Sequence, residues 1–157
     1  METIEILSLY ETERGKPMPS KLHSRIQIRL STLLEINYGI KYTMFSELSL
    51  ALTEWASVPD LAIYPATEID FSEDETQMTT PPLCAIEILS PSQSFNELIA
   101  KADKYFQHGV QSCWLVIPVV KNIYVFTSRE HYEIYRFPYT LEDPALGISI
   151  DLKEVFR

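Results

Sequence analysis

Leu83-Cys84-Ala85-Ile86-Glu87-Ile88-Leu89-Ser90 is the stretch of sequence that decides the fold. Its apolar run is interrupted only by Glu87, which is typical of a central strand buried on both faces of a sheet. Pro91 ends the strand because proline cannot continue a central ladder. A buried carboxylate is costly unless another group pairs with it, so Glu87 needs a partner.

A second acid lies in similar surroundings earlier in the chain, in Val58-Pro59-Asp60-Leu61-Ala62-Ile63. Two carboxylates, each on its own strand, can converge on one hard cation such as Mg²⁺, which binds oxygen ligands and keeps several waters. The backbone carbonyl of Ile88 could supply a third oxygen. Asp60, Glu87 and Ile88 are therefore the candidate metal ligands.

The rest of the chain alternates helical and strand patterns. Apolar residues recur at helical spacing over 20–36, after Ser20 as a helix N-cap. A second helix begins at Ser94, which forms a capping-box pair with Glu97, and ends at His108-Gly109. Strands are expected at 44–53, 57–64, 83–89, 112–117, 121–127 and 131–137, with a long loop at 65–82 and an irregular tail at 138–157 whose apolar residues could cover the core.

This order of elements, α-β-β-β-α-β-β-β, predicts a single α+β domain over residues 1–157, with 1–16 as a weakly patterned arm. A chain of 157 residues is long enough for one domain with a real core. No apolar run approaches the roughly 20 residues that span a bilayer, and the acidic N-terminus does not look like a secretory signal. Cys84 and Cys113 sit in apolar runs, which favours buried free thiols in a cytoplasmic protein.

Two lysines on the second predicted helix point in different directions. At about 100° per residue, Lys101 falls at the edge of the apolar face, beside Tyr105, whereas Lys104 falls almost opposite that face, in solvent. Lys101 can therefore reach the strand ends. Two acids and a lysine on this frame indicate metal-dependent phosphodiester cleavage, in which the metal activates a water and the lysine stabilises negative charge.

These motifs, in this order, resemble the bacterial Uma-two family of restriction-endonuclease-like proteins within the PD-(D/E)XK nuclease superfamily. The resemblance runs from about residue 17 to the end. It is carried by Val58-Pro59-Asp60, Glu87-Ile88-Leu89-Ser90-Pro91-Ser92, Lys101-x-x-x-Tyr105, Gly109-Val110 and Trp114-Leu115-Val116.

The resemblance implies a restriction-endonuclease-like core, a central mixed sheet flanked by helices, with DNA as the substrate and Mg²⁺ as the cofactor, for which Mn²⁺ can substitute. By match, Asp60 and Glu87 are the metal ligands. Leu89 departs from the superfamily pattern, which has a lysine two residues after the acid. The resemblance implies that this lysine comes from the following helix, as Lys101.

Charge limits the ways in which the protein can bind nucleic acid. The net charge of −9 argues against a general nucleic-acid binder. Residues 45–100 contain ten acids and no lysine or arginine, so the acidic excess lies in the segment with both candidate ligands. A basic stripe recurs at i, i+4 and i+8 on the first helix, where it either contacts DNA phosphates or forms a solvated face. The stripe consists of Lys21, Arg25 and Arg29.

Three further residues are possible accessories to the site. Glu47, on the strand before Asp60, either joins the metal site or faces solvent. His23, which opens the first helix, either points to the cleft or has a structural role. Gln93 either positions substrate or shapes its loop.

The leading hypothesis is a Mg²⁺-dependent DNA endonuclease, and the alternative is a catalytically inert binding or assembly module of the same fold. A small-molecule hydrolase is less favoured, because no Ser-His-Asp order, phosphate loop or zinc spacing is present. Cleavage of both strands of a duplex needs two active sites, which a homodimer supplies. The aromatic strands 121–127 and 131–137 could form its interface, or they could lie under the 138–157 tail of a monomer.

Overall fold

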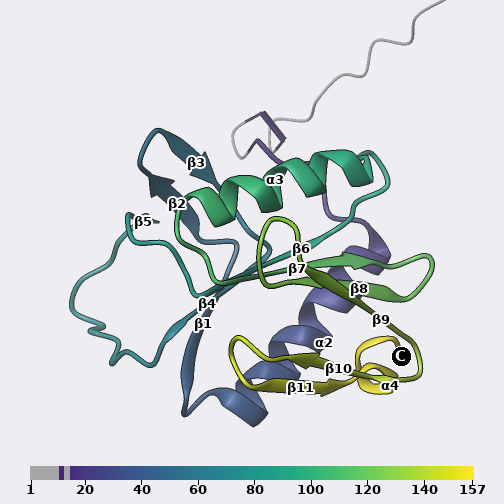
Figure 1. The fold of residues 1–157 in the computed structure, drawn as a ribbon. Helices are drawn as coiled ribbons and strands as arrows, with labels where there is room; N and C mark the ends of the chain where they lie inside the picture. Colours follow the sequence, from purple (N-terminus) through teal and green to yellow (C-terminus); the bar gives the residue numbers. More distant parts are fainter. Residues whose placement is uncertain (1–10, 13–14) are drawn as a thin grey trace, which may run out of the picture.

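The computed structural model describes residues 11–12 and 15–157. Its centre is a six-stranded mixed sheet in the order β1-β4-β6-β7-β8-β9 (Figure 1). All neighbouring strands are antiparallel except β6 and β7, which are parallel. The strands are β1 (Tyr42–Ser46), β4 (Leu61–Pro65), β6 (Cys84–Ile88), β7 (Ser112–Ile117), β8 (Asn122–Phe126) and β9 (Tyr132–Arg136).

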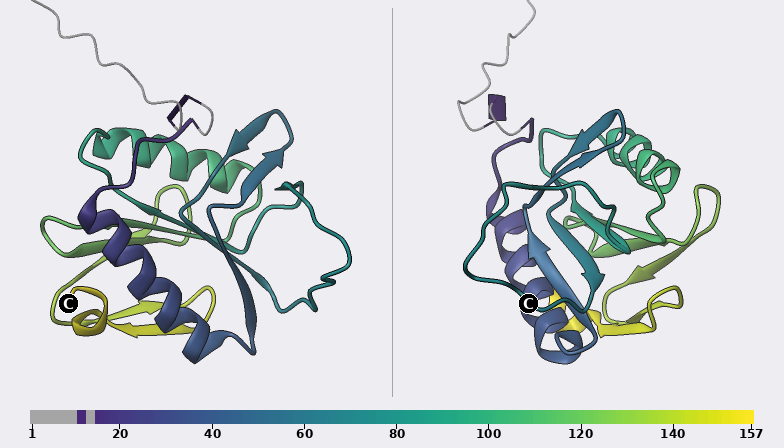
Figure 2. Two further views of the ribbon diagram at one scale, coloured as in Figure 1. Left: turned by 180° about the vertical axis from the view of Figure 1, so that it is seen from behind. Right: turned by 90° about the vertical axis from the view of Figure 1, so that its left-hand side faces the viewer.

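Helices cover both faces of this sheet. Helix α2 (Lys21–Tyr38) lies on one face, and helix α3 (Phe95–Gln107) connects the parallel strands β6 and β7 across the other. Figure 2 shows α2 crossing the sheet on the side opposite to α3. A small sheet lies next to α3, and a C-terminal hairpin with a short helix lies next to α2. The small sheet consists of β2 (Ser49–Leu52), β3 (Trp55–Ser57) and β5 (Gln77–Met78). The C-terminal hairpin consists of β10 (Thr140–Asp143) and β11 (Ile148–Asp151), and the short helix is α4 (Leu152–Val155).

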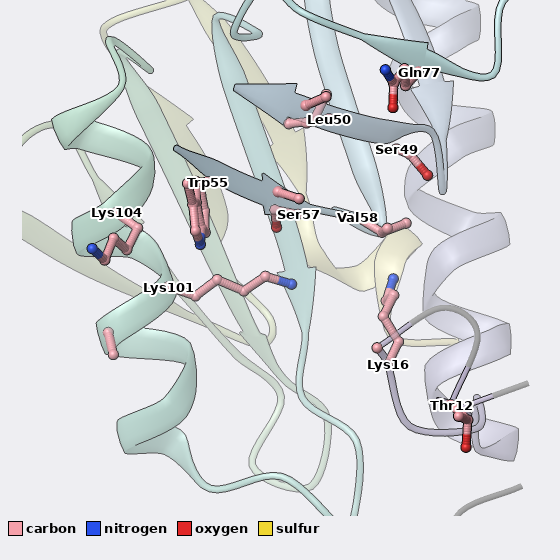
Figure 3. Close-up of a pocket in the computed structure, with 14 residues that line it drawn as sticks. Thr12, Lys16, Ser49, Leu50, Trp55, Ser57, Val58, Gln77, Lys101 and Lys104 are labelled. Carbon is pink, nitrogen blue, oxygen red and sulfur yellow. The ribbon is translucent and has the colours of Figure 1, made fainter. Parts of the chain in front are cut away.

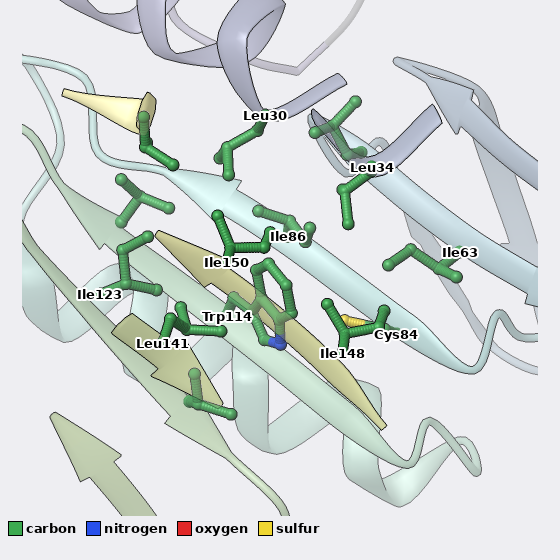
Figure 4. Close-up of a cluster of buried hydrophobic side chains, with 14 of the residues drawn as sticks. Leu30, Leu34, Ile63, Cys84, Ile86, Trp114, Ile123, Leu141, Ile148 and Ile150 are labelled. Carbon is green, nitrogen blue, oxygen red and sulfur yellow. The ribbon is translucent and has the colours of Figure 1, made fainter. Parts of the chain in front are cut away.

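Each face of the sheet carries its own apolar core. Because side chains alternate along a strand, Ile86 of β6 points to α2, and Ala85 points to α3. Leu30 and Leu34 of α2 pack on Ile86 and on Trp114 in the first core (Figure 4). The second core joins α3 to the small sheet. The central strands are thus buried on both faces, as the apolar run around Glu87 predicts.

The helix starts follow the capping residues. Ser20 Oγ accepts a hydrogen bond from the His23 amide at 3.1 Å, and Ser94 Oγ accepts one from the Glu97 amide at 3.2 Å. Each side chain satisfies an amide that the first helical turn leaves without a partner. Helix α3 and strands β6 to β9 lie where the sequence predicts them, within one or two residues at each end.

Two predicted strands are each divided in two by the structure. The segment 44–53 is broken at Glu47, which has φ 52° and ends β1 before β2 begins. The segment 57–64 is broken at 58–60, between β3 and β4. The first break falls at two consecutive polar residues, Ser46 and Glu47, and the second contains Pro59, so both interruptions leave a trace in the sequence that the strand prediction passed over.

The prediction of an irregular tail at 138–157 is wrong. This segment forms β10, β11 and α4, and the apolar side chains of all three elements are buried in the core on the α2 side. Asp143 is fully buried, and it accepts a hydrogen bond from Trp114 Nε1 at 2.7 Å. Asp143 thereby ties the hairpin to the central sheet. The expectation that the tail covers the core is confirmed.

Cys84 and Cys113 are buried free thiols, as expected. Within residues 11–12 and 15–157, no helix combines the length and the apolar character needed to cross a membrane. The predicted arm over 1–16 lies mostly outside the described residues.

Candidate active site

The two candidate acids lie side by side at one end of the central sheet. Leu61 of β4 pairs with Ile86 of β6 in an antiparallel register, so extending this register by one residue places Asp60 opposite Glu87. Directly opposed residues have Cβ atoms about 4.5–5.5 Å apart. Both acids are buried, with 1% and 2% of their surface exposed, and both line one cavity of about 10 Å³. That volume is about the minimum for a single water molecule.

Glu87 is held by two groups from α3. Lys101 Nζ lies 2.8 Å from Glu87 Oε1, and the Tyr105 hydroxyl donates a hydrogen bond to the same oxygen at 2.7 Å. Ser57 Oγ lies 2.8 Å from the Tyr105 hydroxyl and fixes it from the other side. Burial raises the pKa of Glu87. The positive charge of Lys101 opposes this rise and the negative charge of Asp60 adds to it, so the pKa stays above its ordinary value.

Lys101 projects from α3 toward the strand ends, and its side chain is 23% exposed. Lys104 is exposed, one turn further along the helix. The geometry of the helix therefore separates these two lysines in the way that their sequence positions indicate.

Asp60 is surrounded by donors. His23 Nε2 lies 3.1 Å from Asp60 Oδ2, and the Ile88 amide donates a hydrogen bond to the same oxygen at 2.7 Å. Lys16 Nζ lies 2.6 Å from the other oxygen, Oδ1. Burial raises the pKa of Asp60, but the hydrogen bond from His23 and the charge of Lys16 outweigh it and hold this pKa below its ordinary value.

Lys16 is the residue of this site that the sequence analysis missed. Its ammonium lies between Asp60 and Glu47, whose Oε1 is 3.5 Å away, and only 9% of its side chain is exposed. The residue precedes the first helix in a short segment without periodicity, so its pairing with Asp60 depends on tertiary structure alone. Tyr105 was noted only as part of a motif. Its spacing of four residues from Lys101 on one helix face was the signal for a shared contact.

The three accessory candidates all line the same small cavity. Glu47 ends β1 in a left-handed conformation and contacts Lys16. His23 is buried, and its Nδ1 has no hydrogen-bond partner among the described residues. Gln93 accepts a hydrogen bond from the Ser90 amide at 3.1 Å through its side-chain oxygen, and so shapes the loop before α3.

Two arginines of the basic stripe on the first helix contact the C-terminal residues, and the phosphate contact stays a prediction. Arg25 Nε donates a hydrogen bond to the Arg157 carbonyl at 2.9 Å, and Arg29 Nε donates one to the Glu154 carbonyl at 2.8 Å. These two arginines therefore contact the C-terminal residues from α2, and both Lys21 and Arg25 are exposed.

A larger cleft of about 770 Å³ opens beside the acid pair, and Lys16 and Lys101 form part of its wall (Figure 3). Across residues 11–12 and 15–157, no group of three or more His, Cys, Asp and Glu side chains could hold a metal ion by itself. A cation at Asp60 and Glu87 would take its remaining ligands from the backbone and from water.

Two acids at the ends of neighbouring strands and a helix-borne lysine, at the end of a mixed sheet enclosed by helices, are the arrangement expected of the restriction-endonuclease-like fold class. The chain belongs to the Uma2 family, described as "Putative restriction endonuclease", whose model matches residues 11–153.

A solved structure supports the same class. It is the crystal structure of a "putative nuclease belonging to DUF820" from Anabaena variabilis ATCC 29413. It matches with a TM-score of 0.78 and 25% sequence identity, over 90% of this chain and 83% of that chain. No curated protein matches the chain. The predicted family and fold class are confirmed, and both findings support a nuclease.

Proposed function

We propose that the protein is a Mg²⁺-dependent endonuclease that hydrolyses phosphodiester bonds in DNA. Asp60 and Glu87 hold the cation, and Lys101 stabilises charge on the phosphate. The observation that carries the proposal is the pair of buried carboxylates facing one cavity, with a lysine ammonium against each of them. A charged pair is expensive to bury, so its presence at a sheet end favours a functional role.

The side chains at this site fit a hard divalent cation. The donor atoms are carboxylate oxygens, which Mg²⁺ and Mn²⁺ both accept, with the Ile88 carbonyl as a further candidate. Asp60 Oδ1 already binds a positive charge, the Lys16 ammonium, and the contacts that hold Glu87 both use Oε1. Lys16 must withdraw for a metal to reach Asp60 Oδ1. When bound, the metal would polarise the phosphate and lower the pKa of a bound water.

The chain's own side chains prepare the site for this chemistry. The Lys101 ammonium donates hydrogen bonds to the phosphate oxygens on which negative charge develops. Tyr105 fixes the orientation of Glu87, and His23 and the Ile88 amide fix that of Asp60. The burial of both acids keeps competing water away and strengthens these interactions.

Cleavage of both strands of a duplex would use a homodimer. Strand β9 is at the edge of the central sheet, where an exposed ladder favours pairing with another chain. Apolar side chains on and beside it are exposed, including Tyr132 at 50%, Ile134 at 45% and Phe137 at 40%. The C-terminal hairpin leaves these side chains uncovered, which supports an interface between two copies.

The test is a plasmid-nicking assay with Mg²⁺ or Mn²⁺. The wild-type protein is expected to nick the plasmid, Glu87→Gln and Lys101→Met to lose about 10²-fold or more in rate, and Lys153→Met to match the wild type. Cutting by Glu87→Gln at the wild-type rate would refute the site. DNA binding without cleavage under either metal would instead favour the inert nuclease-fold module.

A further inference from the structure

The cleft of about 770 Å³ beside the acid pair has an unusual charge for this chain. It lies between α3, the β2–β3 hairpin and the segment around Lys16 (Figure 3). Lys16, Lys101 and Lys104 all line it, and none of the 14 described residues that line it is an acid. The whole chain has a net charge of −9. The charged side chains among the described lining residues are therefore all lysines, on a chain whose net charge is negative.

Lys104 is the lysine that carries uncompensated charge. Lys16 and Lys101 are paired with the buried acids, whereas Lys104 makes no ion pair with any residue that the structure describes. Its exposed ammonium is free to bind an anion from solvent. Arg25 and Arg29, the other basic candidates, contact C-terminal residues and do not line this cleft.

A fixed aromatic ring lies in the same cleft. Trp55 is half-buried, and Figure 3 shows it between β3 and the lysines of α3. The indole makes a T-shaped contact with Tyr105, with ring centres 4.9 Å apart, and stacks on His108 at 5.3 Å. These two contacts hold the ring in place before any ligand binds, which lowers the cost of binding.

A groove that combines lysine side chains with a fixed aromatic ring is suited to binding unpaired nucleic-acid strands. The lysines follow the phosphates, and the ring stacks on a base, which contributes about 5- to 150-fold in affinity per base. A volume of about 770 Å³ falls in the range of sites for small organic ligands, about 300–1,000 Å³. It suits a short segment of one strand better than the full width of a duplex.

We propose that this lysine cleft, defined by Lys16, Lys101, Lys104 and Trp55, binds one unpaired DNA strand and leads it to Asp60 and Glu87. Lys104 contacts a phosphate next to the one that is cut, and Trp55 stacks on a base. The claim that the strand leads to Asp60 and Glu87 rests on the proposed function, whereas the claim that the cleft binds the strand does not. In a dimer, each subunit would hold one strand.

The test measures binding in EDTA, where a metal-dependent nuclease does not cut. Fluorescence anisotropy of a labelled 12-nucleotide single strand and of its duplex is recorded from 50 to 200 mM salt. Lys104→Met is expected to weaken single-strand binding about 3- to 10-fold and to reduce the salt slope by about 0.7, the loss of one phosphate contact. Lys153→Met, whose side chain is 62% exposed on α4, is the matched control and should bind like the wild type.

Tryptophan fluorescence gives an independent readout. The chain has two tryptophans, and Trp114 is fully buried, so quenching by an unlabelled single strand reports on Trp55. We expect quenching in the wild type and none in Trp55→Phe, whose fold is checked by thermal unfolding.

Tighter binding of the duplex than of the single strand, or equal binding by Lys104→Met and Lys153→Met, would overturn the inference. Plasmid nicking in Mg²⁺ that persists in such a case would leave the proposed nuclease activity intact. Strand binding as described without any nicking would refute the proposed activity and support the cleft.

Discussion

Replacing Lys16 with methionine should destabilise the metal-free protein. The ammonium lies 2.6 Å from Asp60 Oδ1, and both residues are buried. Removing one member of a buried pair leaves an uncompensated charge and costs about 3–5 kcal/mol. His23 and the Ile88 amide still contact Asp60 Oδ2, so we expect the lower end, about 3 kcal/mol. For a domain of this size, that is a fall in Tm of about 6–12 °C.

The same substitution should strengthen metal binding. In the wild type, Mn²⁺ must break the contact between Lys16 and Asp60 before it reaches Oδ1, whereas in Lys16→Met this oxygen is open. Metal at about 100 times its Kd stabilises a protein by about 2.7 kcal/mol, so Mn²⁺ should restore most of the lost stability. Calorimetric titration with Mn²⁺ should give a lower Kd for the variant than for the wild type.

Thermal unfolding in EDTA and in Mn²⁺ checks both statements. Lys153→Met should behave as the wild type, and a second substitution, Asp60→Asn, should abolish the gain from Mn²⁺. If Lys16→Met unfolds at the wild-type temperature in EDTA, or gains no more than the wild type from Mn²⁺, then Lys16 does not occupy the cation position and the reasoning fails.

Three other outcomes are expected. The folded-state pKa of Glu87 is raised above its ordinary 4.5. The stability of the wild type relative to Glu87→Gln should therefore fall as the pH rises from 4.5 through that pKa, and then level off. Urea unfolding from pH 4.5 to 8 measures this difference in stability, and a difference that stays constant would contradict the prediction. Arg29→Ala loses its hydrogen bonds to Glu154 and should cost about 1.5 kcal/mol in urea unfolding, whereas no change would argue against the anchoring of α4. Light scattering at micromolar concentration should give twice the chain mass of 18.1 kDa, and the mass of a single chain would exclude the dimer.

The parts of the fold that the sequence predicts correctly are those with local signals. Helices α2 and α3 combine an N-cap serine with an apolar face, and β6 to β9 are apolar runs between clear turns. The C-terminal hairpin was not predicted although β10 and β11 alternate polar and apolar residues around a turn, and its attachment to the central sheet depends on a distant partner. The Asp143 carboxylate accepts a hydrogen bond from Trp114 of β7, and no local sequence pattern predicts that bond.

In the candidate site too, the residues with local sequence signals could be predicted and the others could not. Asp60 and Glu87 could be paired from sequence because each stands in an apolar strand run, and Lys101 could be chosen because a helix has a calculable direction. Lys16 could not be found, since 44 residues separate it from Asp60 and the segment around it follows no period. The hydrogen-bond partners of Arg25 and Arg29 could not be predicted either, because they depend on where the C-terminal residues lie.

The position of the lysine has a consequence for how such sites are recognised. The acids are fixed by the register of β4 and β6, but Lys101 approaches Glu87 from a helix, and Leu89 is left to pack in the core beneath α3. Any residue of that helix facing the sheet end could present an ammonium there. Strand register thus constrains the acids more tightly in sequence than the helix face constrains the lysine. In proteins of this fold, a lysine at the sheet end is therefore better sought by its position in space than by its distance along the chain from the acids.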